Sequence, residues 1–421
     1  MCREGNRNFS VAERQGIPPE ASLRTVAWPL TSMLAIQALV SAAALTVPVF
    51  AVVAAADLGV PARWVGAYVG LIYAGAMFSS VLGGVLVLRF GAVRVSQVCL
   101  LLAAASLSLT ATAWLPAVVF GALVMGIGYG PPTPASSHIL ARLTPGRLMP
   151  LVFSIKQTGV PLGGALAGVI VPPLVLAYGW RGASITVAAL CVLTAILLAP
   201  LRAGLDADRE PGRRFGGNPM SPLRRVLADR VLRRLAFLSF LYSSVQMSLT
   251  AYLVTYLVEA VKLDLIVAGM IFATAQLAGV FGRVIWGALT SVAVSARNML
   301  VIIGFLSAVG ALVTASFAPG WPLGAIFAVA VLFGATAIGW NGVYLAEFAR
   351  LCPPGQAGLL TGGSGFITFG GVVVTPPLFG AWVGFSGSYS SAFIILGVLA
   401  VLGAVLMIRT PVTGDRGMSG A

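Results

Sequence analysis

The sequence predicts an all-α membrane protein in which twelve transmembrane helices form two bundles of six. Hydrophobic residues make up 58% of its 421 residues and charged residues only 9%. The apolar residues occur in continuous runs of about twenty, long enough for a helix to cross a bilayer, whereas a β-barrel would show short alternating segments. One polar stretch, Arg202 to Arg234, separates two very apolar halves and cannot cross a membrane.

The apolar runs give the helices in chain order. We expect the first six helices at about 28–53, 65–88, 95–114, 117–141, 150–176 and 182–200, and the second six at about 233–258, 267–290, 298–318, 322–348, 358–383 and 389–409. The predicted domains are an N-terminal tail (1–27), a first bundle (28–201), a basic linker (202–232), a second bundle (233–409) and a C-terminal tail (410–421).

The net charge of +14 reflects topology. In a soluble protein it would suggest nucleic acid, but here the arginines gather at helix ends on one side of the predicted membrane. Because positive loops stay inside, we expect the linker and both termini in the cytoplasm. The first 27 residues have no apolar core and so are not a signal peptide. The sequence predicts a multi-pass protein of the bacterial cytoplasmic (inner) membrane, in contact with lipid and not with nucleic acid.

The two halves repeat one another. Helices two and eight align at an offset of 203, helices one and seven at 209, and helices four and ten at 208. The aligned pairs include Gly66 with Gly269, Gln37 with Gln246, Gly126 with Gly334, and Arg142 with Arg350. Such a parallel repeat predicts a substrate site between the halves, near mid-membrane.

Glycine and proline are concentrated in particular helices. Helices two, five, eight and eleven are glycine-rich, which predicts close helix approach. Prolines gather at 131–134, 161, 172–173 and 376–377. Since each proline removes a backbone donor, we expect kinks or local unwinding there.

These features resemble the major facilitator superfamily, over about Trp28 to Arg409. In the loop after helix two, the matches to the family motif are Gly84, Arg89, Gly91 and Arg94. Leu88 replaces the motif's acidic residue, so a latch between conformations must be made differently here or be weak. The helix-five residues that resemble an antiporter motif are Gly159, Pro161, Gly163 and Gly164. The resemblance implies alternating access between two bundles.

Arg283 is the candidate that bears most on substrate. The surrounding segment, Gly282 to Gly287, is similar to helix eight of oxalate/formate and monocarboxylate porters, where the arginine is implicated in binding the substrate carboxylate. An ionisable side chain near mid-membrane costs roughly 2.5–3.5 kcal/mol on insertion scales and is seldom kept without use. The alternative is an arginine that only hydrogen-bonds to helix carbonyls.

Other polar residues complete the predicted site. Lys156 is a second candidate cation, although its side chain has the alternative of snorkelling to the cytoplasmic surface. His138 and Glu347, at corresponding places in the repeat, are either a proton relay or gate, or interfacial residues. The uncharged candidates for the cavity are Gln37, Gln246, Tyr242, Asn341 and Tyr73, with interhelical hydrogen bonding as their alternative role.

The sequence therefore predicts a secondary transporter, expected to be monomeric, for a small organic anion such as a carboxylate. Uniport, exchange for a counter-anion, and proton symport through His138 or Glu347 remain open. A multidrug or metabolite efflux antiporter is the second interpretation, supported by helix five and disfavoured by Arg283, which would repel cationic drugs. An enzyme or sensor finds little support, because the chain has one histidine, no paired mid-membrane acids and no sizeable soluble domain. No metal-ligand spacing or cofactor motif is present.

Overall fold

The computed structural model describes residues 23–145, 148–212, 220–353 and 356–408, and every element in these ranges is helical. Eleven of the described segments are long and apolar enough to cross a membrane. One of them, Leu151–Leu205, has 55 residues. At 1.5 Å per residue it would measure roughly 80 Å, far more than the ~30 Å of a hydrocarbon core. Its helix is interrupted at Gly179, whose φ of 70° and ψ of 168° are not helical. Two crossings joined at Gly179 are consistent with the predicted twelve.

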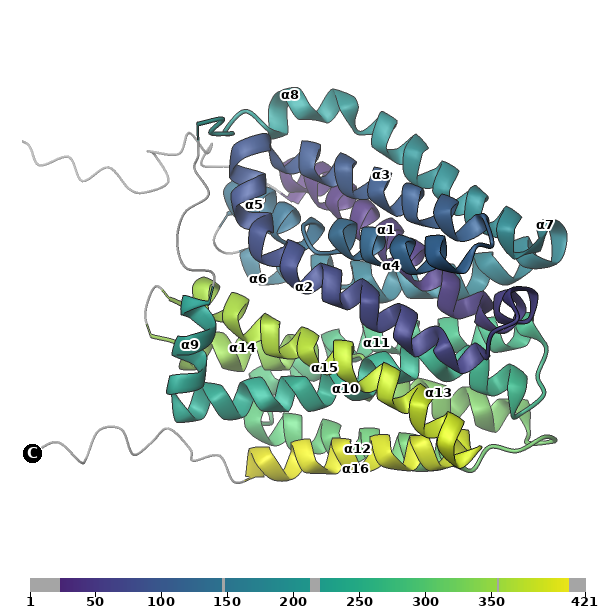
Figure 1. Ribbon diagram of the computed structural model, residues 1–421. Coiled ribbons are helices and arrows are strands. Elements are labelled where there is room, and N and C mark those ends of the chain that lie inside the picture. The colour runs from purple at the N-terminus through teal and green to yellow at the C-terminus, as the bar shows by residue number, and fades with distance from the viewer. Residues whose placement is uncertain (1–22, 146–147, 213–219, 354–355, 409–421) are drawn as a thin grey trace, which may run out of the picture.

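The first bundle is built from the N-terminal helices, which fill the upper half of Figure 1. Its helices are α1 (Leu23–Leu58), α2 (Val65–Phe90), α3 (Ala92–Ala111), α4 (Leu115–Tyr129), α5 (Pro132–Leu143), α6 (Met149–Gln157) and α7 (Gly159–Leu197), with a short 3-10 turn η2 (Ala62–Trp64) before α2. Within it, α7 packs against α1 and α3, and α4 packs against α2 and α3.

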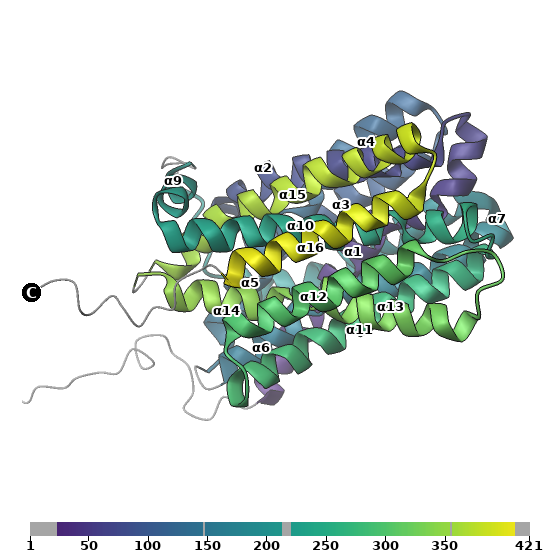
Figure 2. The same ribbon diagram turned by 90° about the horizontal axis from the view of Figure 1, so that it is seen from below.

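The second bundle occupies the lower half of Figure 1. Its helices are α10 (Arg230–Glu259), α11 (Leu265–Val292), α12 (Ala296–Ala315), α13 (Leu323–Ala337), α14 (Asn341–Leu351), α15 (Ala357–Ser386) and α16 (Tyr389–Ile408). The turned view shows the same long helices running side by side along the molecule (Figure 2). The chain that connects the two bundles contains a second 3-10 turn, η4 (Ala199–Leu201), and the short helices α8 (Arg202–Leu205) and α9 (Ser221–Ala228). Residues 213–219 of the predicted linker and most of both predicted tails lie outside the described ranges.

One helix in each bundle is broken, and the two breaks lie at positions that the sequence repeat makes equivalent. The fourth predicted helix divides into α4 and α5 at Gly130 and Pro131, and the tenth divides into α13 and α14 at residues 338–340. These breaks are related by the offset of 208 found in the sequence. The proline-rich segment therefore interrupts the helix at 130–131, although Gly130 and Pro131 keep right-handed helical dihedrals. In contrast, Pro376 and Pro377 lie inside the continuous helix α15.

The interface between the bundles is also nearly symmetric. A Cβ at Gly66 of α2 would lie 2.2 Å from the carbonyl oxygen of Pro376 of α15, and a Cβ at Gly269 of α11 would lie 2.6 Å from Pro172 of α7. Each contact joins a glycine of one bundle to a proline of the other, at corresponding places in the repeat. The prediction that glycine permits close approach is confirmed at these positions, because any larger side chain would meet the opposing helix.

Candidate substrate site between the two bundles

Arg283 joins the two bundles. It lies in the C-terminal half of α11 and is half-buried. Its Nε donates a hydrogen bond to the carbonyl oxygen of Ile338 at 3.2 Å, within its own bundle. Its Nη1 donates to the carbonyl oxygen of Gln157 at 2.5 Å, across the interface. Neither acceptor is charged, so in this conformation the guanidinium binds helix carbonyls, as the alternative interpretation expected.

The helix-five motif explains why the Gln157 carbonyl is free. In an α-helix that oxygen would accept from the amide four residues later, which here is Pro161 and has no N–H. The motif glycines serve packing: a Cβ at Gly163 would lie 2.1 Å from the Ala38 oxygen of α1, and one at Gly164 would lie 2.7 Å from Gln276 of α11. A Cβ at Gly159 would lie 3.1 Å from Gln37. The motif therefore lets α7 lie close to both bundles and exposes an acceptor to Arg283.

Lys156 does not snorkel to the surface. Only 2% of the residue is exposed. Its Nζ donates hydrogen bonds to the Thr133 carbonyl oxygen at 3.1 Å and to the Ser137 hydroxyl at 2.6 Å. The prediction of an escape to the interface is wrong, because the broken helix α5 places polar oxygens within reach inside the bundle. Lys156 directly precedes Gln157, so both cations approach the same turn between α6 and α7.

The two repeat-related glutamines face different surroundings. Gln37 of α1 is 5% exposed and donates weakly to the Thr133 hydroxyl at 3.4 Å. Its Oε1 is buried and has no hydrogen-bond partner among the described residues. Gln246 of α10 is half-buried, and its Oε1 accepts from Trp340 Nε1 and Asn341 Nδ2, both at 3.0 Å. Gln246 and Asn341 thus meet beside the helix break that also supplies the Ile338 carbonyl to Arg283.

The two candidate tyrosines also differ. Tyr73 of α2 donates to the Tyr129 hydroxyl at 3.1 Å, and its ring lies 5.7 Å from that of Phe369 of α15, so it contacts both bundles. Tyr242 of α10 donates to the Leu300 carbonyl oxygen at 2.7 Å and packs inside the second bundle. Of the two, only Tyr73 contacts the other bundle.

His138 and Glu347 have different partners. His138 lies 2.6 Å from Asp208 of the linker, which also forms an ion pair with Arg142. Burial tends to raise the pKa of Asp208, but hydrogen bonds from Arg142 and His138 outweigh it, and the pKa lies below its usual 3.8. Glu347 is buried and accepts two hydrogen bonds from Arg350, at 2.8 and 2.7 Å.

Acidic residues of the linker contact the loop between α2 and α3, where Leu88 replaces the acidic residue of the family motif. Asp206 is buried, and its two oxygens accept from the amides of Val93 at 2.8 Å and Arg94 at 3.1 Å, at the start of α3. Gly91 has a φ of +94°, and a Cβ there would lie 2.3 Å from the Asp206 carboxyl carbon. The Leu88 carbonyl oxygen accepts from the Glu210 amide at 2.7 Å. We call Asp206, Asp208 and their partners the linker clasp.

Gly84 and Arg89 are the remaining residues of the loop motif. A Cβ at Gly84 would meet nothing within 4 Å. The Arg89 guanidinium carbon lies 5.4 Å from the ring of its neighbour Phe90. Sequence reasoning missed the roles of Asp206, Asp208, Thr133 and Gln276, because their partners are far away in the chain. The one available signal for the two linker acids was the missing acid at position 88.

Two helical bundles that meet around a polar interface define a membrane transport protein. The chain belongs to the Major Facilitator Superfamily, whose family model matches residues 33–376. The family and the fold are those of transporters rather than enzymes.

Known proteins resemble the chain over most of its length. It is 24% identical to the hexuronate transporter of Bacillus subtilis (strain 168) over 314 residues, which are 68% of this chain and 71% of that protein. A bacterial homolog of the human lysosomal transporter Spinster, solved inward-facing and occupied, superposes with a TM-score of 0.71 at 15% identity, covering 93% of this chain and 98% of that one. A D-xylose–proton symporter gives 0.71 at 16% identity, covering 92% and 98%.

Proposed function

We propose that the protein moves a small organic anion, most simply a carboxylate, across the cytoplasmic membrane by alternating access between its two bundles. The main evidence for an anionic substrate is the presence of two buried cations, Arg283 and Lys156. Among the described residues, neither forms an ion pair with an Asp or Glu, and both are held only by neutral oxygens. Arg283 lies between the bundles, and Lys156 lies inside the first bundle next to Gln157, which binds Arg283. Such uncompensated positive charge favours an anionic ligand.

The similarity to a hexuronate transporter supports the same substrate class, because a hexuronate is a sugar carboxylate. In the proposed site, Arg283 binds the carboxylate, exchanging its carbonyl contacts for two parallel hydrogen bonds. Gln37, Gln246, Asn341 and Tyr73 are available to bind the hydroxyl groups of a sugar acid. Tyr242 would act indirectly, by packing the helix that carries Gln246.

An efflux antiporter is the second candidate, favoured by the helix-five motif. That motif also has a packing explanation here, through Pro161, Gly163 and Gly164, and the two cations oppose a cationic drug. Proton coupling through His138 or Glu347 would have to break the ion pair with Asp208 or Arg350. We therefore favour uniport or anion exchange.

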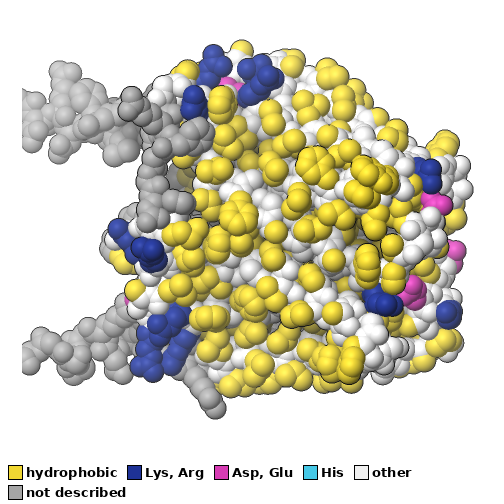
Figure 3. All heavy atoms as spheres, in the orientation of Figure 1, with side chains coloured by type: hydrophobic (Ala, Val, Ile, Leu, Met, Phe, Trp, Pro, Cys, Tyr) yellow, Lys and Arg dark blue, Asp and Glu magenta, His cyan; other side chains and the backbone are white. Residues whose placement is uncertain are grey.

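The charge distribution supports the proposed orientation. Lys and Arg side chains gather at the end of the molecule where α6, α9 and α14 lie, and few occur at the opposite end (Figure 3). We propose that this basic end, with both termini, is cytoplasmic. We also propose that the chain divides into a first bundle (28–201), a basic linker (202–232) and a second bundle (233–409), because the linker is a charged segment between two apolar halves.

Substitution of Arg283 tests the proposed substrate. Binding of labelled hexuronates and simpler carboxylates is measured on purified protein, alongside its melting temperature. Because a hydrogen bond to a charged group contributes about 1.5–3 kcal/mol, we expect Arg283→Gln to weaken binding roughly 10- to 100-fold, and Arg283→Lys to weaken it less.

Arg297 provides a matched control. It also binds helix carbonyls, those of Met407 and Ile408, but within the second bundle. Arg297→Gln is expected to lower the melting temperature and to leave affinity unchanged. If Arg283→Gln behaves in the same way, Arg283 only stabilises helix ends and the anion site is elsewhere.

A further inference from the structure

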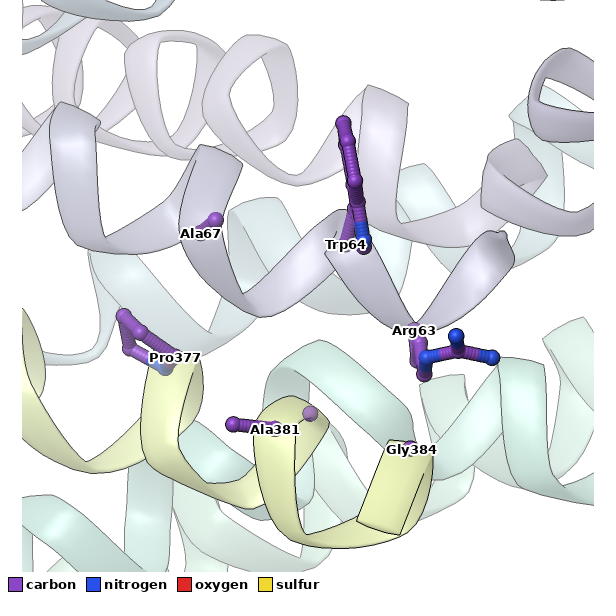
Figure 4. Close-up of a pocket in the computed structure, with 7 residues that line it drawn as sticks. Arg63, Trp64, Ala67, Pro377, Ala381 and Gly384 are labelled. Carbon is purple, nitrogen blue, oxygen red and sulfur yellow. The ribbon is translucent and has the colours of Figure 1, made fainter. Parts of the chain in front are cut away.

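A cavity of about 520 Å³ lies at the end of the molecule opposite the basic end, between the two bundles. Figure 4 shows its walls, which are formed by Arg63, Trp64 and Ala67 from η2 and α2, and by Pro377, Ala381 and Gly384 from α15. Apart from Arg63 and the indole of Trp64, the lining is aliphatic or glycine. The cavity is thus mostly apolar, with a cation beside it.

The Arg63 guanidinium lacks a partner among the described residues. Its side chain is half-buried and lies across α15, where a Cβ at Gly384 would be 2.8 Å from Nε. The guanidinium forms neither a hydrogen bond nor an ion pair with any described residue. Arg181, at the same end, is instead paired with Asp57 at 2.9 Å. Arg63 therefore has unused hydrogen-bonding capacity at the edge of the cavity.

Exposed aromatic side chains place the cavity at the level of lipid headgroups. Trp64 is 53% exposed, Trp382 is 40% exposed and Phe385 is 86% exposed. Tryptophan is enriched at the membrane–water interface, where its ring is partly in hydrocarbon and partly in water. A site at this depth with a cation above an apolar groove matches a phospholipid, whose phosphate is charged and whose chains are not.

We propose that this cavity binds one phospholipid of the outer leaflet, with its phosphate on Arg63 and an acyl chain between α2 and α15. A carboxylate substrate fits less well. A sugar acid would need several hydrogen-bond donors and acceptors, and the nearby carbonyls of Arg63 and Pro376 already accept from Tyr252, at 2.7 and 3.0 Å. The phosphate needs only the guanidinium.

The walls come from different bundles, which has a consequence for transport. If the bundles separate at this end, as the proposed alternating access requires, the groove is divided and the lipid loses half of its contacts. A ligand that binds one conformation better stabilises that conformation. The lipid would therefore favour the state in which this end is closed. This consequence rests on the proposed transport function and the outer leaflet rests on the proposed orientation, whereas the binding site itself rests on neither.

Photocrosslinking tests the site directly. The full-length protein in detergent micelles is mixed with phosphatidylglycerol that carries a diazirine on its acyl chain, irradiated, and analysed by peptide mass spectrometry. We expect label on the α2 and α15 segments that line the cavity. Arg63→Gln is expected to reduce this label at least fivefold, and Arg181→Gln, the matched control, to leave it unchanged.

Two further arms separate the parts of the proposal. Ala381→Trp, which fills the groove and retains Arg63, is expected to abolish the label, and Ala67→Leu serves if that variant does not fold. Diacylglycerol with the same diazirine, which lacks the phosphate, is expected to label weakly.

Equal labelling by diacylglycerol, or label that survives both Arg63→Gln and Ala381→Trp, would overturn the proposal. Competition by a soluble carboxylate would instead make the cavity a substrate vestibule. Because no transport is measured, failure here is distinct from failure of the proposed function.

Discussion

At the scale of single residues, the sequence located the buried cations but not their partners. Arg283 and Lys156 stand out because charge is rare in apolar helices. What each side chain binds depends on carbonyls released at helix breaks, and these involve Gln157, Thr133 and Ile338. A lysine near a helix end often snorkels to the surface. Lys156 does not, because α5 places polar oxygens within hydrogen-bonding distance of its ammonium group.

Lys156 provides a prediction at this scale. Burying an ammonium without an acid costs free energy, so removing the charge does not destabilise a fold that uses it only for function. We expect Lys156→Met to melt at the wild-type temperature or higher, and to bind carboxylates about tenfold more weakly or worse, in line with a charged hydrogen bond.

The only other lysine, Lys262, is exposed and serves as the control. Lys262→Met is expected to leave both affinity and melting temperature unchanged. The interpretation fails if Lys156→Met melts well below wild type and retains its affinity, since Lys156 would then be a structural residue.

At the scale of helices, the repeat was the most productive sequence feature. It predicted equivalent helices, and the structure breaks α4/α5 and α13/α14 at equivalent places. The repeat could not predict the linker clasp, because Asp206 and Asp208 lie outside the repeated segments and bind residues of the first bundle. Three of their partners, Val93, Arg94 and His138, are 70 to 113 residues away in the chain. No local pattern reports such a contact.

The clasp makes stability depend on pH in one direction. The pKa of Asp208 is lowered in the folded protein, so its carboxylate stabilises the fold above the usual value of 3.8. This stabilisation is fully present at neutral pH and is lost as pH falls through the lowered pKa. We expect Asp208→Asn to lower the melting temperature at neutral pH and to flatten its decline in acid.

A melting series in detergent from about pH 7 to pH 3 measures this, over the range in which carboxylates titrate. His138→Gln, which leaves the Arg142 partner in place, is expected to remove only part of the effect. Parallel acid limbs for wild type and Asp208→Asn would show that the clasp contributes nothing to the pH dependence.

At the scale of the whole molecule, one tyrosine joins the two bundles at the end away from the basic residues. The hydroxyl of Tyr252, on α10, donates to the carbonyl oxygens of Arg63 and Pro376 and accepts from the amide of Gly66 at 3.1 Å. The tyrosine is fully buried. Sequence analysis did not single it out, because a tyrosine in a membrane helix is common and its backbone partners carry no signal.

Removing this hydroxyl should open this end of the molecule, which we propose to be the outer one. Loss of a buried hydrogen bond that leaves its partner unsatisfied costs about 1–3 kcal/mol, which corresponds to a roughly 5- to 150-fold change in an equilibrium. If the bundles separate at this end during transport, Tyr252→Phe shifts the population toward the outward-open state. A cysteine at Gln246, in a background without the native cysteines, should then react faster with a membrane-impermeant maleimide added outside right-side-out vesicles. Tyr256→Phe is the matched control, one turn further along α10, because its hydroxyl donates to the carbonyl oxygens of Thr314 and Phe317, both in its own bundle. Equal labelling rates in wild type and both variants would mean that Tyr252 does not hold the outer end closed.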